Sequence, residues 1–281
     1  MRKLIWTCRG GGCGGYADRL KGIVTAYLLA KAVGREFFIE WDGITNLQEC
    51  FDVPCAFDGA RVQGAENLRL VDCLEHNINP AIGMLFDMKQ ETVYISANQY
   101  DELHCRALGN GQSMPETFAR VLNRLMTPTA AITIHPEYLK AAKFLTSHTA
   151  GVQVRTGEQN YPHEHDLKRI DTRKVWGRVL LDDLTKVFIA SDSPRWKDDF
   201  AAVHPEIPSH QIRFVPAHIE RSVPEDIRRT FLLTVIEHQI LSKCSRIYTG
   251  WGGFGRTAAW WGQKPYIDLL TATLANAGGR A

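Results

Sequence analysis

The chain has 281 residues, of which 44% are hydrophobic and 23% are charged. This composition is typical of a globular protein with one large or two medium domains. The formal net charge of +2 is too small to indicate nucleic acid or an anionic membrane as the main partner.

The apolar runs and the cysteines predict a cytoplasmic protein. No run of 18 apolar residues is present, so we expect no transmembrane segment, and the start MRKLIWTCRGGG lacks the apolar stretch of a signal peptide. The seven cysteines form no CxxC pair and no zinc-site spacing, so we expect free thiols and no structural metal. Cys50 and Cys55 are the close pair considered for a bridge, which we do not expect to form.

The N-terminal stretch predicts a strand over residues 3–8, a glycine-rich loop over 9–15 and a helix over 16–33 that ends at Gly34. A strand, a glycine loop and a helix N-terminus together favour an anion site. Gly14 and Gly15 allow the backbone to approach a ligand closely. Asp18 and Arg19 fall in the first turn of the helix, at the mouth of the expected ligand-binding crevice. A tight turn without a ligand is the alternative, and the spacing is neither GxGxxG nor a P-loop.

The rest of the first half continues as an α/β alternation. A second strand is predicted over 36–41, further strands over 68–71 and 92–96, and helices over 115–126 and 136–146. Residues 42–66 are irregular, which in a compact domain is usually functional. The segment 127–129 leads toward a second domain, and we expect the domains to cover residues 1–147 and 148–281.

The second half repeats the alternation. Strands are predicted over 151–155, 186–191, 211–215, 246–249 and 265–269, and helices over 173–184, 224–243 and from 257. Asp192-Ser193-Pro194 starts another helix, capped by Asp192 or Ser193. The sequence therefore predicts an α/β fold of two Rossmann-like domains that face each other across a cleft.

Arg155 ends the strand 151–155 and is followed by Thr156-Gly157. An arginine at the carboxyl end of a parallel strand points into the crevice where open α/β sheets bind ligands. There its planar fork can hold phosphate with two parallel hydrogen bonds, which favours a clamp on the diphosphate of a sugar nucleotide. A surface salt bridge is the alternative reading of this residue.

The loop 250–255 is a second glycine-rich loop between a strand and a helix. The backbone N–H groups of Gly250, Gly252 and Gly253, with the Thr249 hydroxyl, suit phosphate or ribose. Trp251 and Phe254 have the rings to stack on a base, although packing is the commoner role.

Three carboxylates are candidates for the same site. Glu237 lies among apolar residues of its helix, and a guanine edge offers the two parallel donors that a buried carboxylate needs. A pairing with a helix N-terminus, Arg228 or Arg229 is equally compatible with the spacing. Asp192 stands after a buried strand, and Glu158, three residues beyond Arg155, is the preferred general base in a loop that also suits a metal site.

Several of these segments resemble the GDP-fucose fucosyltransferase superfamily, which includes the core and Nod-factor, plant xyloglucan and protein O-fucosyltransferases. The resemblance rests on residues 14–23 (GGYADRLKGI), 151–155 (GVQVR) and 187–192 (VFIASD). It also rests on the helix with Glu237 and on the loop 250–255. It spans residues 3 to about 262 as short motifs in the family's order.

The resemblance implies a GT-B fold and an inverting, metal-independent transfer of fucose from GDP-fucose, without a cofactor. Arg155 would bind the β-phosphate and stabilise the departing GDP, and the Glu237 carboxylate would recognise guanine by hydrogen bonds. Gln153, which stands where the family usually has a histidine, as in its plant branch, is expected to contact the nucleotide. Thr156 replaces a second arginine, and the serines of the last loop are glycines here.

The acceptor is expected to be a hydroxyl of a glycan or glycolipid. The alternatives left open are a transferase for another nucleotide sugar and a nucleotide-sugar- or glycan-binding module without turnover. The GDP-fucose-dependent transferase is the function that we predict.

Overall fold

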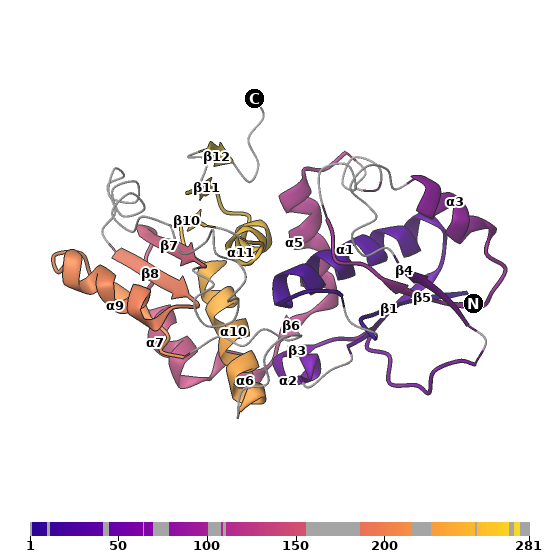
Figure 1. Ribbon diagram of the computed structural model, residues 1–281, viewed down its shortest axis with the longest axis horizontal. Coiled ribbons are helices and arrows are strands. Elements are labelled where there is room, and N and C mark those ends of the chain that lie inside the picture. The colour runs from indigo at the N-terminus through magenta and orange to yellow at the C-terminus, as the bar shows by residue number, and fades with distance from the viewer. Residues whose placement is uncertain are drawn as a thin grey trace. The chain divides into compact units, whose positions relative to one another are not determined.

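The computed structural model describes residues 2–9, 12–41, 45–63, 65–69, 79–100, 108, 111–155, 186–214, 226–250, 252–269 and 273–275. The chain divides into two compact units, Met1–Thr127 and Pro128–Ala281 (Figure 1). The division comes before the expected boundary at 147/148, because α6 (Ala130–Thr133) and α7 (Pro136–Phe144) pack against a helix of the second unit, α10 (Ile227–Leu241).

The first unit is a parallel four-stranded sheet in the order β2-β1-β5-β4. Its elements are β1 (Lys3–Thr7), α1 (Tyr16–Ala32), β2 (Glu36–Glu40), α2 (Leu47–Cys50), β3 (Phe51–Asp52), β4 (Glu66–Arg69), α3 (Asn79–Asp87), β5 (Thr92–Ser96), α5 (Met114–Leu125) and β6 (Thr127–Pro128). Helix α1 packs on β1 and β2, and α5 packs on α1.

Local sequence explains how these helices begin and end. Gly34 follows α1 with a φ of 65°, which favours glycine and ends the helix as predicted. Ser113 and Glu116 form a reciprocal capping box at the start of α5. Gly22 in α1 lies so close to the β5 end that an added Cβ would sit 1.7 Å from the Ala97 carbonyl oxygen. This contact sets how closely α1 approaches the sheet.

The second unit is a six-stranded sheet in the order β12-β11-β10-β7-β8-β9, parallel except for β12. Its strands are β7 (Thr149–Val154), β8 (Lys186–Ser191), β9 (Ser209–Gln211), β10 (Arg246–Thr249), β11 (Tyr266–Asp268) and β12 (Thr273–Ala275). Its further helices are α9 (Pro194–Val203) and α11 (Phe254–Gly262).

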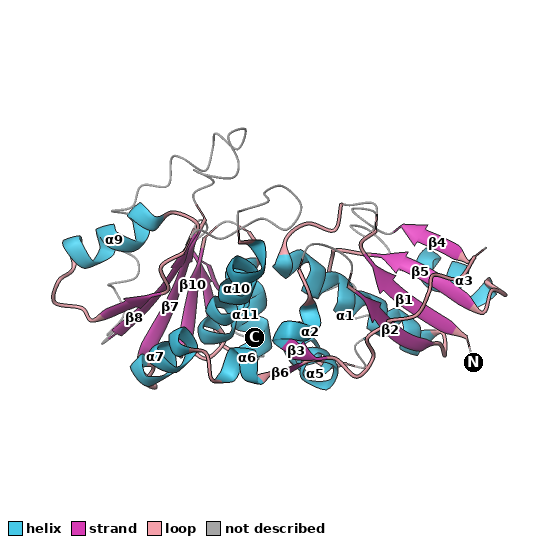
Figure 2. Cartoon of the chain, turned by 90° about the horizontal axis from the view of Figure 1, so that it is seen from below, coloured by secondary structure: helices cyan, strands magenta, loops and turns pink. Residues whose placement is uncertain are grey.

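Figure 2 shows α9 on one side of this sheet and α10 and α11 on the other. Strand β7 is buried along its whole length and pairs with β8 and β10. Its apolar side chains Val152 and Val154 form a core cluster with residues of β8, α9 and β10. Runs of apolar residues buried on both faces are what a central parallel strand requires.

The prediction of free thiols is wrong for the first two cysteines. Cys8 and Cys13 form a disulfide that ties the end of β1 to the glycine-rich loop. Cys50, Cys55 and Cys244 are free, as expected. Because both pairs have the same spacing, only the folded geometry, with 5.8 Å between the Cα atoms of Cys8 and Cys13, distinguishes them.

Within the described residues, no helix has both the length and the apolar character needed to cross a membrane. The same residues contain no group of three or more metal-ligating side chains. The loop 158–166, for which a metal site was considered, lies outside the described residues.

Candidate functional site

The candidate site lies at the carboxyl edge of the second sheet. The chain adds β8 and β9 on one side of β7, then crosses to add β10 and β11 on the other side. The crevice between the carboxyl ends of β7 and β10 is therefore the topological switch point, where open α/β sheets bind their ligands. The two segments that leave this point are Arg155 and the glycine loop 250–253.

Arg155 directly follows β7 and is half-buried, as the strand-end prediction requires. Its guanidinium lies against the glycine loop, because a Cβ added at Gly252 would be 3.5 Å from Nη1 of Arg155. Gly252 has a φ of 100°, which a side chain would strain. The Gly250 N–H donates to the Gln153 carbonyl at 2.8 Å, which holds the start of the loop beside β7. The structure therefore brings the predicted clamp and the predicted loop together.

The N-terminus of α11 opens onto this loop. Its N-cap is Gly253, which supplies no side-chain hydrogen bond to the first turn. A Cβ on Gly255 would lie 2.8 Å from Thr249 Oγ1 and 3.0 Å from the Gln153 Cβ. Glycine at this position therefore lets the helix start directly against β10. A helix start without a side-chain cap, beside a guanidinium, suits an anion.

Gln153 and Thr249, both predicted to contact the nucleotide, are buried at the base of the site. They lie opposite each other in the β7–β10 register, and the Thr249 hydroxyl donates to Gln153 Oε1 at 3.2 Å. Their observed contact is with each other. It fixes the two strand ends from which Arg155 and the loop emerge.

Asp192 follows β8 and is half-buried at the same edge of the sheet. It is not the helix cap: the N-cap of α9 is Ser193, whose Oγ accepts from the Trp196 N–H at 3.3 Å. Capping therefore does not account for the position of Asp192. Burial is the main cause that raises the pKa of Glu237, and the charge of Asp192 raises it further.

Glu237 is buried and paired with Lys197, a partner that was not expected. The Lys197 ammonium donates to Glu237 Oε1 at 3.0 Å and to the Ile212 carbonyl at 2.8 Å, and both side chains of the pair are almost fully buried. Burial raises the pKa of Glu237, while the charge and hydrogen bond of Lys197 lower it. The carboxylate that was predicted to face guanine thus has a cation beside it in the fold.

Phe254 begins α11 and makes an edge-to-face contact with the buried His238 ring, 5.0 Å between centroids. Packing, the commoner role of an aromatic residue, therefore applies to Phe254. Burial lowers the pKa of His238 to about 3, and its Nε2 lies 3.0 Å from Thr257 Oγ1. The predicted residues Trp251 and Glu158 lie outside the described residues.

The first unit places its predicted residues at the carboxyl end of β1. Gly14 has a φ of 72°, and a Cβ there would lie 2.5 Å from Asp18 Oδ2. Asp18 pairs with Lys21 at 2.7 Å. Arg19 is only 4% exposed, with its guanidinium 5.0 Å from the Trp41 ring centroid. Gly15 is the N-cap of α1 and gives it no side-chain hydrogen bond, so the loop and helix start have the predicted form.

Among the described residues, sequence reasoning did not identify Lys197 and Glu40 as buried charges. Lys197 is followed by Asp198 and Asp199, a pattern that resembles a solvent-exposed helix face. Glu40 ends β2 at 5% exposure, with Oε1 3.2 Å from Arg9 Nη2. Its Oε2 is buried and has no hydrogen-bond partner among the residues that the structure describes. No local pattern distinguishes either residue from an ordinary surface charge.

Comparisons with solved structures find the same fold elsewhere. FUT1 from Arabidopsis thaliana in complex with GDP has 15% identity and a TM-score of 0.64, over 95% of this chain and 70% of that one. NodZ α-1,6-fucosyltransferase soaked with GDP-fucose has 16% identity and a TM-score of 0.62, over 98% of this chain and 99% of that one. The fucosyltransferase NodZ from Bradyrhizobium gives the same values.

No family model and no curated protein sequence matches the chain. At the identities found, the structural likeness establishes the fold. The predicted fold class, α/β of the GT-B type shared with GDP-fucose fucosyltransferases, is confirmed.

Proposed function

We propose that the protein is a GDP-fucose-dependent glycosyltransferase that moves fucose, with inversion, to a hydroxyl of a glycan or glycolipid. The observation that carries the proposal is Arg155 at the switch point of the second sheet, against the glycine loop. The fold adds support, because it is shared with a NodZ structure soaked with GDP-fucose and a FUT1 structure in complex with GDP.

In this proposal the diphosphate binds between Arg155 and the start of α11. Charge develops on the β-phosphate as the bond from fucose C1 to its oxygen breaks, and GDP leaves with the electron pair. A fixed guanidinium and the first-turn N–H groups of α11 stabilise this charge. The residues that form this site supply positive charge without a metal, so the proposed transfer is metal-independent and needs no cofactor.

Glu237 and Asp192 are the proposed contacts to the nucleoside. Guanine presents two parallel donors, and the Glu237 carboxylate, with the Lys197 ammonium beside it, is the proposed acceptor for them. Because Lys197 already occupies Oε1, guanine would approach the other oxygen. A preference for GDP over UDP is therefore the property that tests the role of Glu237.

The acceptor side is proposed for the first unit, where Gly14, Gly15, Asp18 and Arg19 form the loop and helix start at the end of β1. The acceptor oxygen attacks fucose C1, and its proton passes to a general base. Glu158 remains the sequence prediction for that base.

The direct experiment incubates the protein with GDP-fucose and a panel of glycans, and measures GDP release and fucosylated product. The proposal expects release that depends on an acceptor and persists in the presence of EDTA. Turnover with a UDP-sugar and not GDP-fucose would favour a transferase for another nucleotide sugar. Tight GDP-fucose binding without release over a long incubation would indicate a binding module and contradict the proposed transfer.

A further inference from the structure

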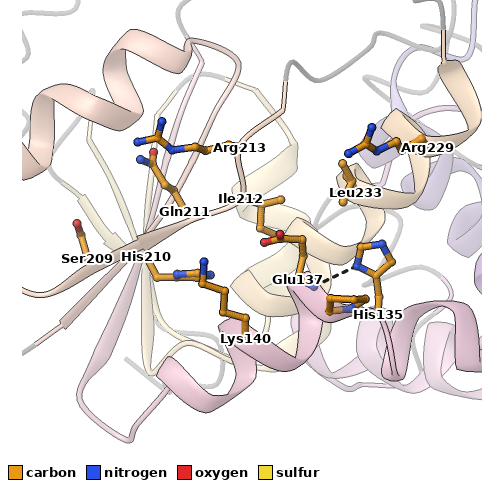
Figure 3. Close-up of a pocket in the computed structure, with 11 residues that line it drawn as sticks. His135, Glu137, Lys140, Ser209, His210, Gln211, Ile212, Arg213, Arg229 and Leu233 are labelled. Atoms are coloured by element: carbon orange, nitrogen blue, oxygen red, sulfur yellow. Dashed lines mark hydrogen bonds between the residues drawn. The ribbon is translucent and has the colours of Figure 1, made fainter.

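A pocket of about 470 Å³ lies within the second unit, apart from the residues assigned to the nucleotide. Its volume is in the range of about 300–1,000 Å³ that is typical of small-molecule sites. Three elements line it: the first turns of α7, the strand β9 with the two residues after it, and the first turns of α10 (Figure 3). None of Arg155, Asp192, Glu237 or the glycine loop is among the lining residues.

The charged residues of the lining are mostly cations. Lys140 comes from α7, Arg213 follows β9 and Arg229 comes from α10, whereas Glu137 is the one carboxylate among the lining residues. Counted over the lysine, the two arginines and the glutamate, three positive charges against one negative charge leave a net charge of +2. Arg213 also makes an exposed ion pair with Asp198 at 3.0 Å, a kind of contact that contributes little and exchanges readily. This charge distribution suits a ligand with an anionic group.

His210 provides an imidazole ring of fixed orientation in the pocket lining. Its ring lies 5.5 Å from Phe144 and 6.1 Å from Phe188 between centroids, which fixes its orientation. Burial lowers the pKa of His210, and Lys140 lowers it further, while Glu137 acts in the opposite direction, so the ring is neutral near pH 7. Its Nε2 is buried and has no hydrogen-bond partner among the described residues. A ligand in the pocket would provide that partner.

His135 is set up in a similar way at the start of α7. Its Nδ1 accepts from the Glu137 N–H at 3.2 Å, shown as the dashed line in Figure 3. In the neutral ring the proton is then on Nε2, which makes that atom a donor. The pocket lining thus combines cations with an imidazole donor, groups that bind phosphate oxygens.

Two lining groups suit hydroxyls rather than an anion. The Glu137 carboxylate accepts hydrogen bonds only. Gln211 donates through Nε2 to Asp198 Oδ1 at 3.1 Å, and its Oε1 is buried with no partner among the described residues. Acceptors beside a cationic group match a molecule that carries several hydroxyls and one phosphate.

We propose that this pocket binds a sugar phosphate monoester at a site separate from the nucleotide. The phosphate lies against Arg229, and sugar hydroxyls donate to the Glu137 carboxylate. The leucine of α10 that lines the pocket, Leu233, supplies an apolar contact for the sugar ring. The inference does not depend on the proposed transfer reaction.

The test is isothermal titration of the full-length protein with glucose 6-phosphate, glucose and inorganic phosphate. Arg229→Ala removes a lining cation, and Arg228→Ala is the matched control, since Arg228 is the neighbouring exposed arginine outside the lining. We expect glucose 6-phosphate to bind more tightly than phosphate, and glucose not to bind. Arg229→Ala should weaken binding about tenfold, while Arg228→Ala changes it less than twofold.

Absence of glucose 6-phosphate binding at millimolar concentration, or equal weakening by the two arginine variants, would overturn the proposal. Binding no tighter than that of inorganic phosphate would overturn the assignment of the sugar. Displacement of glucose 6-phosphate by GDP would show that the pocket belongs to the nucleotide site. GDP binding by the wild-type protein is measured in the same experiment. If the wild-type protein does not bind GDP, that result counts against the proposed function and leaves the pocket proposal to be judged by glucose 6-phosphate alone.

Discussion

The ammonium of Lys197 lies 3.0 Å from Glu237 Oε1 inside the second unit, with both side chains no more than 3% exposed. The two residues are 40 positions apart, on α9 and α10. Their pairing links the helix that follows Asp192 to the helix before the glycine loop.

The first prediction concerns this ion pair. Lys197→Met leaves the Glu237 carboxylate buried without its cation, so we expect a loss of roughly 3–5 kcal/mol in the free energy of unfolding. Glu237→Gln alone leaves the ammonium unpaired and should also destabilise. The double variant should be more stable than the sum of the single effects predicts, which urea denaturation in a double-mutant cycle measures. Additive effects would show that the two charges do not interact.

A second prediction follows from the buried His238. Its pKa falls to about 3 in the folded protein because burial disfavours the charged ring, whereas an unfolded histidine titrates near 6.5. The unfolded state therefore binds more protons below about pH 6.5, and folded stability is lost as the pH falls from there toward 3. Denaturant unfolding between pH 6 and 4 should show a slope about 1.4 kcal/mol per pH unit steeper for wild type than for His238→Gln. Equal slopes would contradict a neutral buried ring.

The third prediction uses two helical glycines. Gly22→Ala would place a Cβ 1.7 Å from the Ala97 carbonyl oxygen, a backbone atom, so α1 must shift away from β5. We expect a loss of about 1–3 kcal/mol or more in stability. Gly83→Ala is the control, since nothing lies within 4 Å of its Cβ, and it should stabilise α3 by about 0.5–1 kcal/mol. Thermal unfolding compares the two, and a harmless Gly22→Ala would contradict the observed packing.

The fourth prediction concerns the Cys8–Cys13 disulfide. The bridge that closes this short loop should raise the free energy of unfolding by roughly 2 kcal/mol. In oxidising buffer, Cys13→Ser should therefore be less stable than wild type by that amount, whereas in reducing buffer the two proteins should be equally stable. Trypsin cuts after Lys3, Arg9 and Arg19, which separates the two cysteines into peptides 4–9 and 10–19. Mass spectrometry of a non-reduced digest should find these peptides joined. Free peptides from oxidised protein would exclude the bridge.

Much of the second unit could be predicted from sequence because its signals are local. The alternation that ends at Arg155 and the glycines after Thr249 specify a strand end and a strand-to-helix turn, and both lie where expected. Helix α1 of the first unit could also be predicted, since its apolar spacing indicates a helix and Gly34 indicates where that helix ends.

Contacts between distant segments could not be predicted in the same way. Lys197 looks like a surface residue until α10 brings Glu237 beside it. The closeness of α11 to β10, which requires Gly255, depends on a contact with Gln153, a residue far away in sequence. The N-cap of α9 is Ser193 and not Asp192. These neighbours differ by one position in the chain, and helix propensity does not predict a helix start to within one residue.

The central claim is that the carboxyl edge of the second sheet binds GDP with Arg155 against its diphosphate. Calorimetric titration of GDP into wild type, Arg155→Ala and the control Arg228→Ala tests it most directly, with circular dichroism to verify folding. Loss of two charge-assisted hydrogen bonds should weaken binding to Arg155→Ala by roughly a hundredfold or more, with Arg228→Ala unchanged. A wild-type protein that does not bind GDP, or a folded Arg155→Ala that binds it as tightly as wild type, would contradict the claim.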